Sequence, residues 1–407
     1  MKILIVGKGG REHAIGLKIK ESSLVKEIYF APGNGGMESI GKIVNICEDD
    51  IESLGNFAKR NEIDLTIVGP ESSLSKGIVD EFQRKGLKIF GPTKEAIKIE
   101  SSKEFAKEIM EKYNIPTGKY KSFNNFKDAF EYIKEEKFPI VIKEDGLKSG
   151  KGVTIVNSLE DGRTTLDRIF KEENKVLIEE FLKGREFSII GMVNGDKIIP
   201  LEIAQDHKKA YDKDMGDNTG GMGVYSPVDW VSESIINETM EKIMKPMGQA
   251  LVKENIPFCG FLFGGIMVTE EGVKTIEFNG RFGDPEAQGI LPRLEDDLIE
   301  VILELLDNKT RKLKWKNEYT LGVVLASKGY PHEYVNGYEI ENIKDISKYI
   351  YHMGTKIIGD KLLTNGGRVL TVLGKGGTLE EARVKAYENV SKIKCENLFY
   401  RKDIGQK

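Results

Sequence analysis

Cysteine is scarce in this chain of 407 residues, which contains only Cys47, Cys259 and Cys395. Three widely separated cysteines exclude a disulfide framework and a cysteine-rich zinc site. Free thiols favour a reducing compartment, so we expect a cytoplasmic protein.

Long hydrophobic runs and a large net charge are also lacking. No stretch approaches the ~18 apolar residues of a membrane span, and the apolar part of the opening MKILIVGKGG is too short for a signal peptide. The 61 Lys and Arg nearly balance the 65 Asp and Glu, which gives a formal net charge of −4. This balance argues against binding through bulk charge, so we expect neither nucleic acid nor membrane as a partner.

Glycine, in contrast, is abundant, with 44 residues that occur in clusters. The strand-like residues 2–6, a glycine turn and a helical stretch predict a doubly wound parallel α/β domain of about 100 residues. Short strands and helices over 117–188 predict a small α/β subdomain. Beyond the Lys-rich stretch at 307–318, short strands and hairpins predict a C-terminal domain of mixed β/α type.

The first glycine cluster, GKGGREH at 7–13, places backbone N–H groups and a helix N-terminus at the end of a strand. Such a turn is a natural anion site. It departs from the dinucleotide fingerprint because Glu12 occupies the third glycine position. This departure disfavours a dinucleotide-dependent oxidoreductase, which would also leave residues 140–300 unexplained. A tight turn without a ligand is the alternative.

A second cluster, EDGLKSGKGVTIV at 144–156, alternates glycines with Lys148 and Lys151. Such a hairpin can close over phosphates, because glycine lets backbone amides approach the oxygens and lysine neutralises their charge. Lys143 ends the preceding strand, where a phosphate can pair with it. The spacing excludes a Walker A loop, and a solvated lysine on a hairpin is the alternative.

The strand TIEFNGRFGDPE at 275–286 carries oxygen ligands. Strand alternation places Glu277 and Asn279 on one face and two apolar residues on the other. Two oxygens from a rigid strand are typical of Mg²⁺ bound to nucleotide phosphates. Arg281 and Arg293 follow, and guanidinium groups bind anionic substrates through their bidentate fork. An exposed strand with ordinary polar residues is the alternative.

Two further segments predict binding. The stretch EEFLKGREFSI at 179–189 indicates a hinge whose backbone contacts adenine and whose Glu186 accepts hydrogen bonds from ribose. The stretch 204–227 is polar, glycine-dense and long for a connection, and such loops are usually functional or disordered. Its aromatic and apolar residues favour an ordered binding loop.

The order of these motifs resembles that of ATP-grasp ligases, in which a phosphate hairpin, an adenine hinge and a metal strand follow one another. Within that superfamily the chain is similar, over essentially its whole length, to the phosphoribosylamine–glycine ligase family. The similar segments are GGREH (9–13), GPE (69–71), AQDHKKAYD (204–212), NTGGMGVYSP (218–227), EFNGRFGDPEAQ (277–288), LPRL (291–294), GGRVL (366–370) and FYRKDIG (399–405).

The resemblance implies an α/β multidomain fold with a substrate-binding domain at 1–100, an ATP-grasp region at 101–312 that includes a lid at about 117–188, and a C-terminal domain at 313–407. It implies that ATP, glycine and 5-phosphoribosylamine give glycinamide ribonucleotide through glycyl phosphate, in de novo purine biosynthesis. Mg²⁺ or Mn²⁺ is the implied metal, and we expect a monomer.

The resemblance also implies a role for individual residues. Glu277 and Asn279 hold the metal. The residues implied for ATP are Lys103, Lys143, Glu179, Glu180, Phe181, Leu182, Glu186, Lys209 and Asn218. The residues implied for phosphoribosylamine are Gly10, Gly69, Glu71, Asp206, Arg281 and Arg293. Lys143 and Arg281 are the implied catalytic residues.

Two departures from the family pattern bear on the alternatives. Lys148 and Ser149 replace a small pair in the phosphate hairpin, and FLFGGIMV at 261–268 lacks an acidic residue. The second departure weakens the interpretation as a biotin-carboxylase-like component. Another ATP-grasp carboxylate–amine ligase stays open. A nucleotide-binding regulator without turnover is opposed by the presence of Glu277, Asn279 and Lys143.

Overall fold

A five-stranded parallel sheet forms the N-terminal domain of the structure, a computed structural model that describes residues 1–146, 152–172 and 175–406. Helix α1 (Gly10–Ile19) packs on the face of Ile3 and Ile5, whereas α2 (Ile51–Arg60) and α4 (Ile78–Arg84) pack on the face of Leu4 and Val6. The doubly wound sheet is therefore confirmed. Its strand order is β3 (Lys42–Ile43), β2 (Glu27–Pro32), β1 (Lys2–Gly7), β4 (Leu65–Val68) and β5 (Ile89–Phe90).

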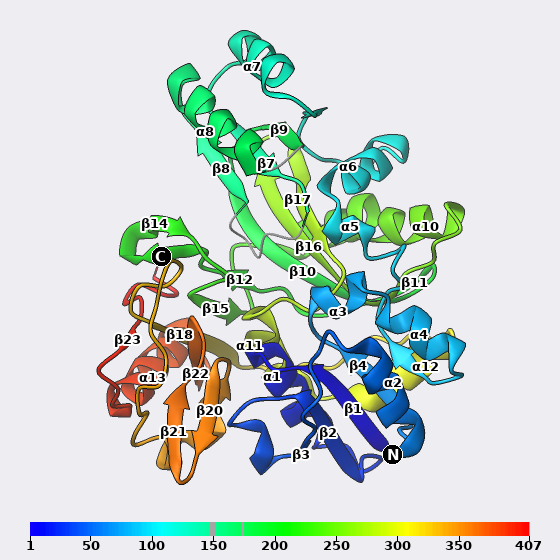
Figure 1. The fold of residues 1–407 in the computed structure, drawn as a ribbon, viewed down its shortest axis with the longest axis vertical. Helices are drawn as coiled ribbons and strands as arrows, with labels where there is room; N and C mark the ends of the chain where they lie inside the picture. The colour runs from blue at the N-terminus through cyan, green and yellow to red at the C-terminus, as the bar shows by residue number, and fades with distance from the viewer. Residues whose placement is uncertain (147–151, 173–174, 407) are drawn as a thin grey trace.

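A small antiparallel sheet carries two helices at one end of the molecule (Figure 1). Helices α7 (Phe126–Glu135) and α8 (Leu159–Glu172) cover it, with Ile133 and Leu166 in their shared core. This unit corresponds to the predicted lid, but Lys148, Ser149 and Lys151 of the phosphate hairpin lie outside the described residues. Its strand order is β6 (Tyr120–Phe123), β9 (Val176–Glu180), β7 (Ile140–Glu144) and β8 (Val153–Val156).

A second antiparallel sheet extends from the lid into the rest of the molecule. Strand β17 contains a bulge, because Glu277 pairs with Gly265 while Thr275 pairs with the next residue, Ile266. Ile276 is the extra residue of this bulge, so its backbone groups are free to bond outside the sheet. The strand order is β11 (Lys197–Pro200), β10 (Arg185–Asn194), β16 (Cys259–Thr269) and β17 (Gly272–Asn279).

Residues 98–112 form two consecutive helices. Ser102 has an extended backbone and separates α5 (Lys98–Ser101) from α6 (Lys103–Lys112). Its hydroxyl accepts a hydrogen bond from Phe105 N at 3.3 Å, as serine does at a helix N-cap. The break turns Lys103 toward the lid sheet.

The C-terminal sheet contains strands from two distant parts of the chain. Strand β15 (Gly223–Ser226) comes from the long glycine-dense segment and pairs with β18 (Tyr319–Ser327). The sheet thus crosses residue 312, and the domain boundary there stays a prediction. The order is β12 (Gln205–Asp206), β15, β18, β22 (Arg368–Gly376) and β19 (Ile350–His352), with β23 (Leu398–Phe399) beside β18 and α13 (Leu379–Lys392) packed on β22.

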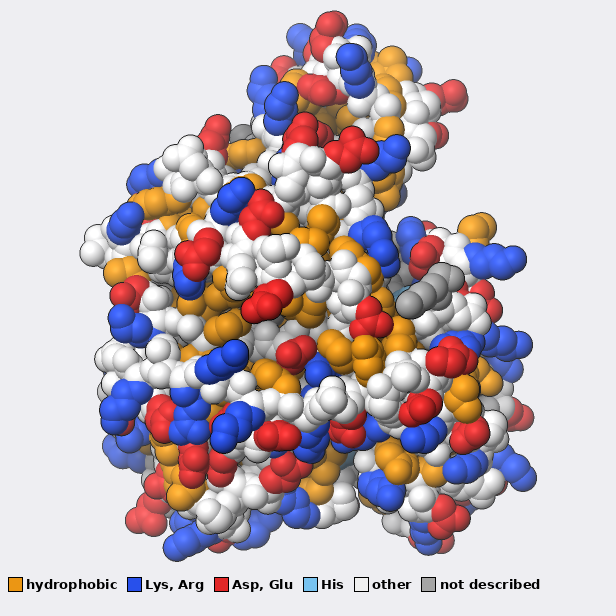
Figure 2. Space-filling model, turned by 180° about the vertical axis from the view of Figure 1, so that it is seen from behind, with side chains coloured by type: hydrophobic (Ala, Val, Ile, Leu, Met, Phe, Trp, Pro, Cys, Tyr) orange, Lys and Arg blue, Asp and Glu red, His pale blue; other side chains and the backbone are white. Residues whose placement is uncertain are grey.

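The three larger parts meet at the centre of the molecule. Helix α1 packs against α11 (Glu286–Ile290) and against β19, so the N-terminal domain contacts both other parts. Figure 2 shows basic and acidic side chains interspersed over one face, in keeping with the nearly neutral chain. Across the described ranges, every helix is too short or too polar to span a bilayer.

Candidate active site

One buried glutamate in the lid sheet pairs with two lysines. The Glu179 carboxylate lies 2.8 Å from Lys107 Nζ and 3.0 Å from Lys143 Nζ, and all three residues are buried. Burial works against the charge of Glu179, but the two lysines hold its pKa below the ordinary value. Two cations on one anion leave a local positive charge, as a polyphosphate site requires.

The remaining protons of these lysines distinguish their roles. Lys107 Nζ also contacts Thr117 Oγ1 at 2.8 Å and Gly118 O at 3.4 Å, so the protein uses all three of its protons. Among the described residues, Lys143 Nζ donates one further bond, to the bulge carbonyl of Ile276 at 3.1 Å. One Lys143 proton therefore stays available for a ligand.

A third lysine completes this side of the site. Lys103 Nζ donates to the carbonyl oxygens of Glu144 and Gly146, both at 2.8 Å, and its third proton has no partner among the described residues. Burial lowers the pKa of Lys103. The structure therefore brings together both lysines that the sequence assigns to phosphates.

Glu179, one of the residues implied for ATP, has its side-chain carboxylate enclosed by Lys107 and Lys143. The hinge residues after it lie differently. Glu180 accepts a bond from Lys119 N at 3.1 Å, and Phe181 is partly exposed. Among the described residues, nothing bonds to the backbone N–H and C=O groups of Phe181 and Leu182. Free backbone groups of this kind can pair with the edge of an adenine ring.

Glu277 is on β17 and is surrounded by lysine and arginine side chains from other segments. Burial opposes its ionisation, but Lys208, Lys143 and Arg281 hold its pKa below the ordinary value. An ionised carboxylate and the nearby Asn279 amide are oxygen ligands that Mg²⁺ or Mn²⁺ accepts. No group of three His, Cys, Asp or Glu side chains forms a metal site in the described part of the chain. The donor set therefore fits a metal that takes its other ligands from phosphates and water.

A lysine that the sequence interpretation missed lies beside Glu277. Lys208, not Lys209, forms the ion pair with Glu186. Burial opposes its charge, but Glu186 and Asp206 raise the pKa of Lys208 well above the ordinary value. Lys209 belongs to a hairpin in which it pairs with Asn218. Strand alternation offered a signal, because it places residues 206 and 208 on one face and 207 and 209 on the other.

Acidic side chains surround the predicted catalytic arginine. Arg281 lies 3.1 Å from Glu100 and 3.6 Å from Glu71, which begins α3 (Glu71–Ser75) at the end of β4. Burial raises the pKa of Glu100 to about 7, whereas Arg281 holds the pKa of Glu71 below its ordinary value despite burial. The guanidinium is thus fixed at the edge of the N-terminal sheet.

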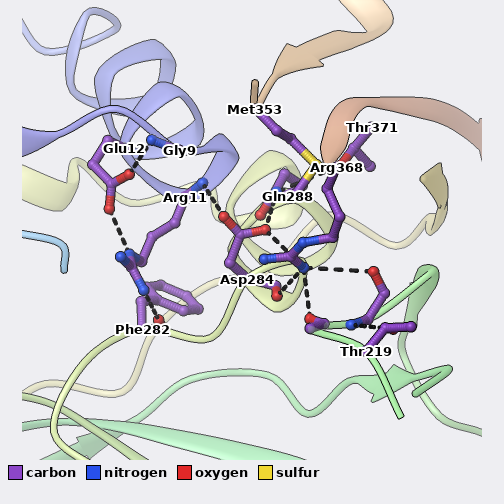
Figure 3. Close-up of polar contacts among 12 residues, drawn as sticks. Gly9, Arg11, Glu12, Thr219, Phe282, Asp284, Gln288, Met353, Arg368 and Thr371 are labelled. Carbon is purple, nitrogen blue, oxygen red and sulfur yellow. Dashed lines mark hydrogen bonds and ion pairs between the residues drawn. The ribbon is translucent and has the colours of Figure 1, made fainter. Parts of the chain in front are cut away.

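The N-terminal turn is occupied by the protein's own carboxylates (Figure 3). Glu12 accepts from Gly9 N at 2.5 Å, and Asp284 accepts from Arg11 N at 3.1 Å. A Cβ atom at Gly69 would overlap the Glu12 side chain, and one at Gly10 would overlap Gln288. These two glycines therefore allow close packing of protein groups at a turn that the sequence assigns to an anion.

Arg293 lies apart from this cluster. Its guanidinium donates to Glu202 at 3.0 Å, to Ser226 Oγ at 2.9 Å and to Glu318 O at 2.7 Å, and the residue is buried. These contacts tie η4 (Leu291–Arg293) to the C-terminal sheet. The position of Arg293 therefore does not support its predicted contact with phosphoribosylamine.

Three family models match the chain in order. The N domain of phosphoribosylglycinamide synthetase matches residues 1–100, its ATP-grasp (A) domain matches residues 101–287, and its C domain matches residues 320–407. The chain belongs to the phosphoribosylglycinamide synthetase family.

Relatives within the phosphoribosylglycinamide synthetase family span the same length. The phosphoribosylamine–glycine ligase of Halalkalibacterium halodurans is 47% identical over 415 residues, which cover 100% of this chain and 97% of the relative. That of Caldanaerobacter subterraneus is 47% identical over 414 residues, with 100% and 99% covered. The crystal structure of the Thermotoga maritima phosphoribosylamine–glycine ligase has a TM-score of 0.88 at 33% identity and covers 99% of this chain and 100% of its own.

The fold of this phosphoribosylglycinamide synthetase family member is shared by solved structures of other proteins. Biotin carboxylase of Campylobacter jejuni has a TM-score of 0.74 at 13% identity, with 99% of this chain and 94% of the other covered. At that identity the likeness concerns the fold alone.

Proposed function

We propose that this chain ligates glycine to 5-phosphoribosylamine at the expense of ATP, giving glycinamide ribonucleotide, ADP and phosphate. Family membership supports this reaction. The structural observation that carries it is the set of Lys103, Lys143 and Lys208 around an ionised Glu277, which is the charge pattern of a metal–polyphosphate site.

The chemistry consists of two displacements. The glycine carboxylate attacks the γ-phosphorus of ATP and releases ADP, and the amine of phosphoribosylamine then attacks the acyl carbon of glycyl phosphate and releases phosphate. No protein nucleophile takes part, so the residues act by positioning and by charge stabilisation.

The roles proposed for individual residues follow their contacts. Lys103 and Lys143 bind phosphate oxygens with the protons they have left. Glu277 and Asn279 would hold Mg²⁺ or Mn²⁺, which when bound neutralises phosphate charge. The backbone of the hinge at 180–182 binds adenine. The other ATP contacts proposed are Glu186, Lys209 and Asn218, and those for phosphoribosylamine are Gly10, Gly69, Glu71, Asp206, Arg281 and, least supported by position, Arg293.

The experiment that tests the function is ADP release measured with ATP, glycine and freshly generated phosphoribosylamine, each omitted in turn. We expect full turnover only with all three, together with formation of glycinamide ribonucleotide. ADP release that depends on bicarbonate and not on glycine would instead identify a carboxylase. Nucleotide binding without amine-dependent hydrolysis would identify a regulator.

Three further points are proposals of the same kind. We propose that the protein acts in the cytoplasm, that it is a monomer, and that either Mg²⁺ or Mn²⁺ supports turnover. Light scattering at micromolar concentration tests the monomer, and turnover of metal-depleted protein with each cation added back tests the metal.

The buried Lys107 predicts a pH dependence of ATP use. Burial lowers its pKa to about 8, so Lys107 loses its charge as the pH rises through this value. The lysine–glutamate cluster then holds phosphate less strongly, and we expect the KM for ATP to rise roughly 3- to 10-fold between pH 7 and 9. In Lys107→Arg the guanidinium stays charged, so the KM of this variant for ATP should not change between pH 7 and 9.

A second variant serves as the matched control for this pH dependence. Lys107→Met should show at pH 7 the high KM that the wild type shows at pH 9, with no further rise. The same alkaline rise in all three proteins would assign the titration to another group.

A further inference from the structure

A single arginine from the C-terminal sheet reaches into the centre of the molecule. Arg368, the first residue of β22, donates from one guanidinium nitrogen to Gly220 O and to Asp284 O, both at 2.6 Å (Figure 3). The same nitrogen lies 3.5 Å from Asp284 Oδ1. Burial opposes its charge, but Asp284 raises the pKa of Arg368, so the guanidinium stays charged.

These contacts join two segments that line the candidate site. Gly220 lies in the glycine-rich turn at 219–221, where Thr219 Oγ1 accepts a bond from Gly221 N at 3.0 Å. Asp284 lies three residues beyond Arg281, in the loop that follows the metal strand. Gly220 precedes β15 of the C-terminal sheet, and Asp284 precedes α11, which packs against that sheet.

The contacts continue into the N-terminal domain. The second carboxylate oxygen of Asp284 accepts from Arg11 N, and Arg11 NH1 donates to Phe282 O at 3.1 Å. Arg368 thus fixes Asp284, and Asp284 fixes the first turn of α1 (Figure 3). Gly10 begins this turn, and Arg281 donates to Phe282 O at 3.4 Å, the carbonyl that Arg11 also contacts. Thr219 at the start of the turn bonds to Lys208 O through its N at 2.7 Å and its Oγ1 at 2.8 Å, whereas the Lys208 side chain is held by its ion pair with Glu186.

We propose that Arg368 is a positioning residue that assembles the phosphoribosylamine half of the site from all three parts of the chain. It holds the turn at 219–221 and Asp284 in a fixed position relative to each other, and it does not touch substrate. A planar guanidinium suits this role, since it can bond two carbonyl oxygens and lie against a carboxylate at once, whereas an ammonium is a point charge. The inference rests on the proposed function.

The test compares steady-state kinetics of Arg368→Ala and Arg368→Lys with the wild type. We expect the KM for phosphoribosylamine to rise at least ~10-fold in both, while the KM for ATP stays within ~3-fold. Guanidinium ion at millimolar concentration should lower the raised KM of Arg368→Ala and leave that of Arg368→Lys unchanged. Lys385→Ala, at an exposed lysine of α13, is the matched control and should match the wild type.

The outcomes separate this inference from the proposed function. An active wild type whose variants show an unchanged KM for phosphoribosylamine, or an equal rise for ATP, would overturn the positioning role alone. A wild type that forms no glycinamide ribonucleotide would overturn the proposed function and this inference with it. If Arg368→Ala does not fold, the test is decided by whether the KM for phosphoribosylamine rises selectively in Arg368→Lys.

Discussion

Glycine-dependent ADP formation should fall by at least ~10³-fold when Glu277 is replaced by Gln, while the fold stays intact. The substitution keeps the shape of the side chain but removes the negative charge that Lys208, Lys143 and Arg281 surround. Without it, β17 would lack the carboxylate that we propose holds Mg²⁺ or Mn²⁺, and the neutralisation of phosphate charge that the metal would supply would be lost. A coupled assay of ADP release at millimolar Mg²⁺ measures the loss.

The same charge change at the turn of the same hairpin provides the control. Glu270 is exposed at the turn between β16 and β17, so Glu270→Gln should keep wild-type turnover. Far-ultraviolet circular dichroism of both variants should match the wild type. Turnover by Glu277→Gln within tenfold of the wild type at ordinary Mg²⁺ would rule out the metal assignment.

Lys143→Met should reduce kcat/KM for ATP by roughly 10²- to 10³-fold, because it removes the proton and the charge that we propose bind the phosphates. Stability should change little. The remaining Glu179 and Lys107 form a one-to-one ion pair at 2.8 Å, so no buried charge is left without a partner. Kinetics and a thermal unfolding curve on the same preparation measure both effects.

An exposed lysine of the same lid supplies the comparison for Lys143. Lys137→Met removes one charge from the lid surface and should leave kcat/KM for ATP unchanged. Glu179→Gln should behave in the opposite way to Lys143→Met, with a marked loss of stability, since it leaves two buried lysines without an anion. If the Lys143→Met protein binds and uses ATP normally, Lys143 is not part of the phosphate site.

Local sequence patterns predicted the parts of the site that lie on single elements. The strand, glycine turn and helix at residues 2–19 are where the pattern places them. Glu277 follows the predicted alternation even though β17 contains a bulge, because the bulge falls at Ile276, before the ligand pair. Each of these features depends on residues within one or two turns of the chain.

The pairings between distant residues were not predictable in the same way. Lys107 and Glu179 are 72 positions apart and meet only because α6 packs beside the lid sheet. The role of Asp284 depends on α1 and on Arg368, which come from opposite ends of the chain. A single sequence contains the residue types for these contacts but no signal of which side chains meet.

The shared C-terminal sheet has a consequence for synthesis on the ribosome. Gly223 of β15 pairs with Val323 of β18, which is translated 100 residues later. At roughly 5–20 residues per second, β15 lacks its partner for about 5–20 s. The nascent glycine-dense segment cannot be fixed in this interval, and Arg368 emerges later still. Lys208 lies in this segment, so the proposed ATP site, like the acceptor side, is completed only after β18 has been translated.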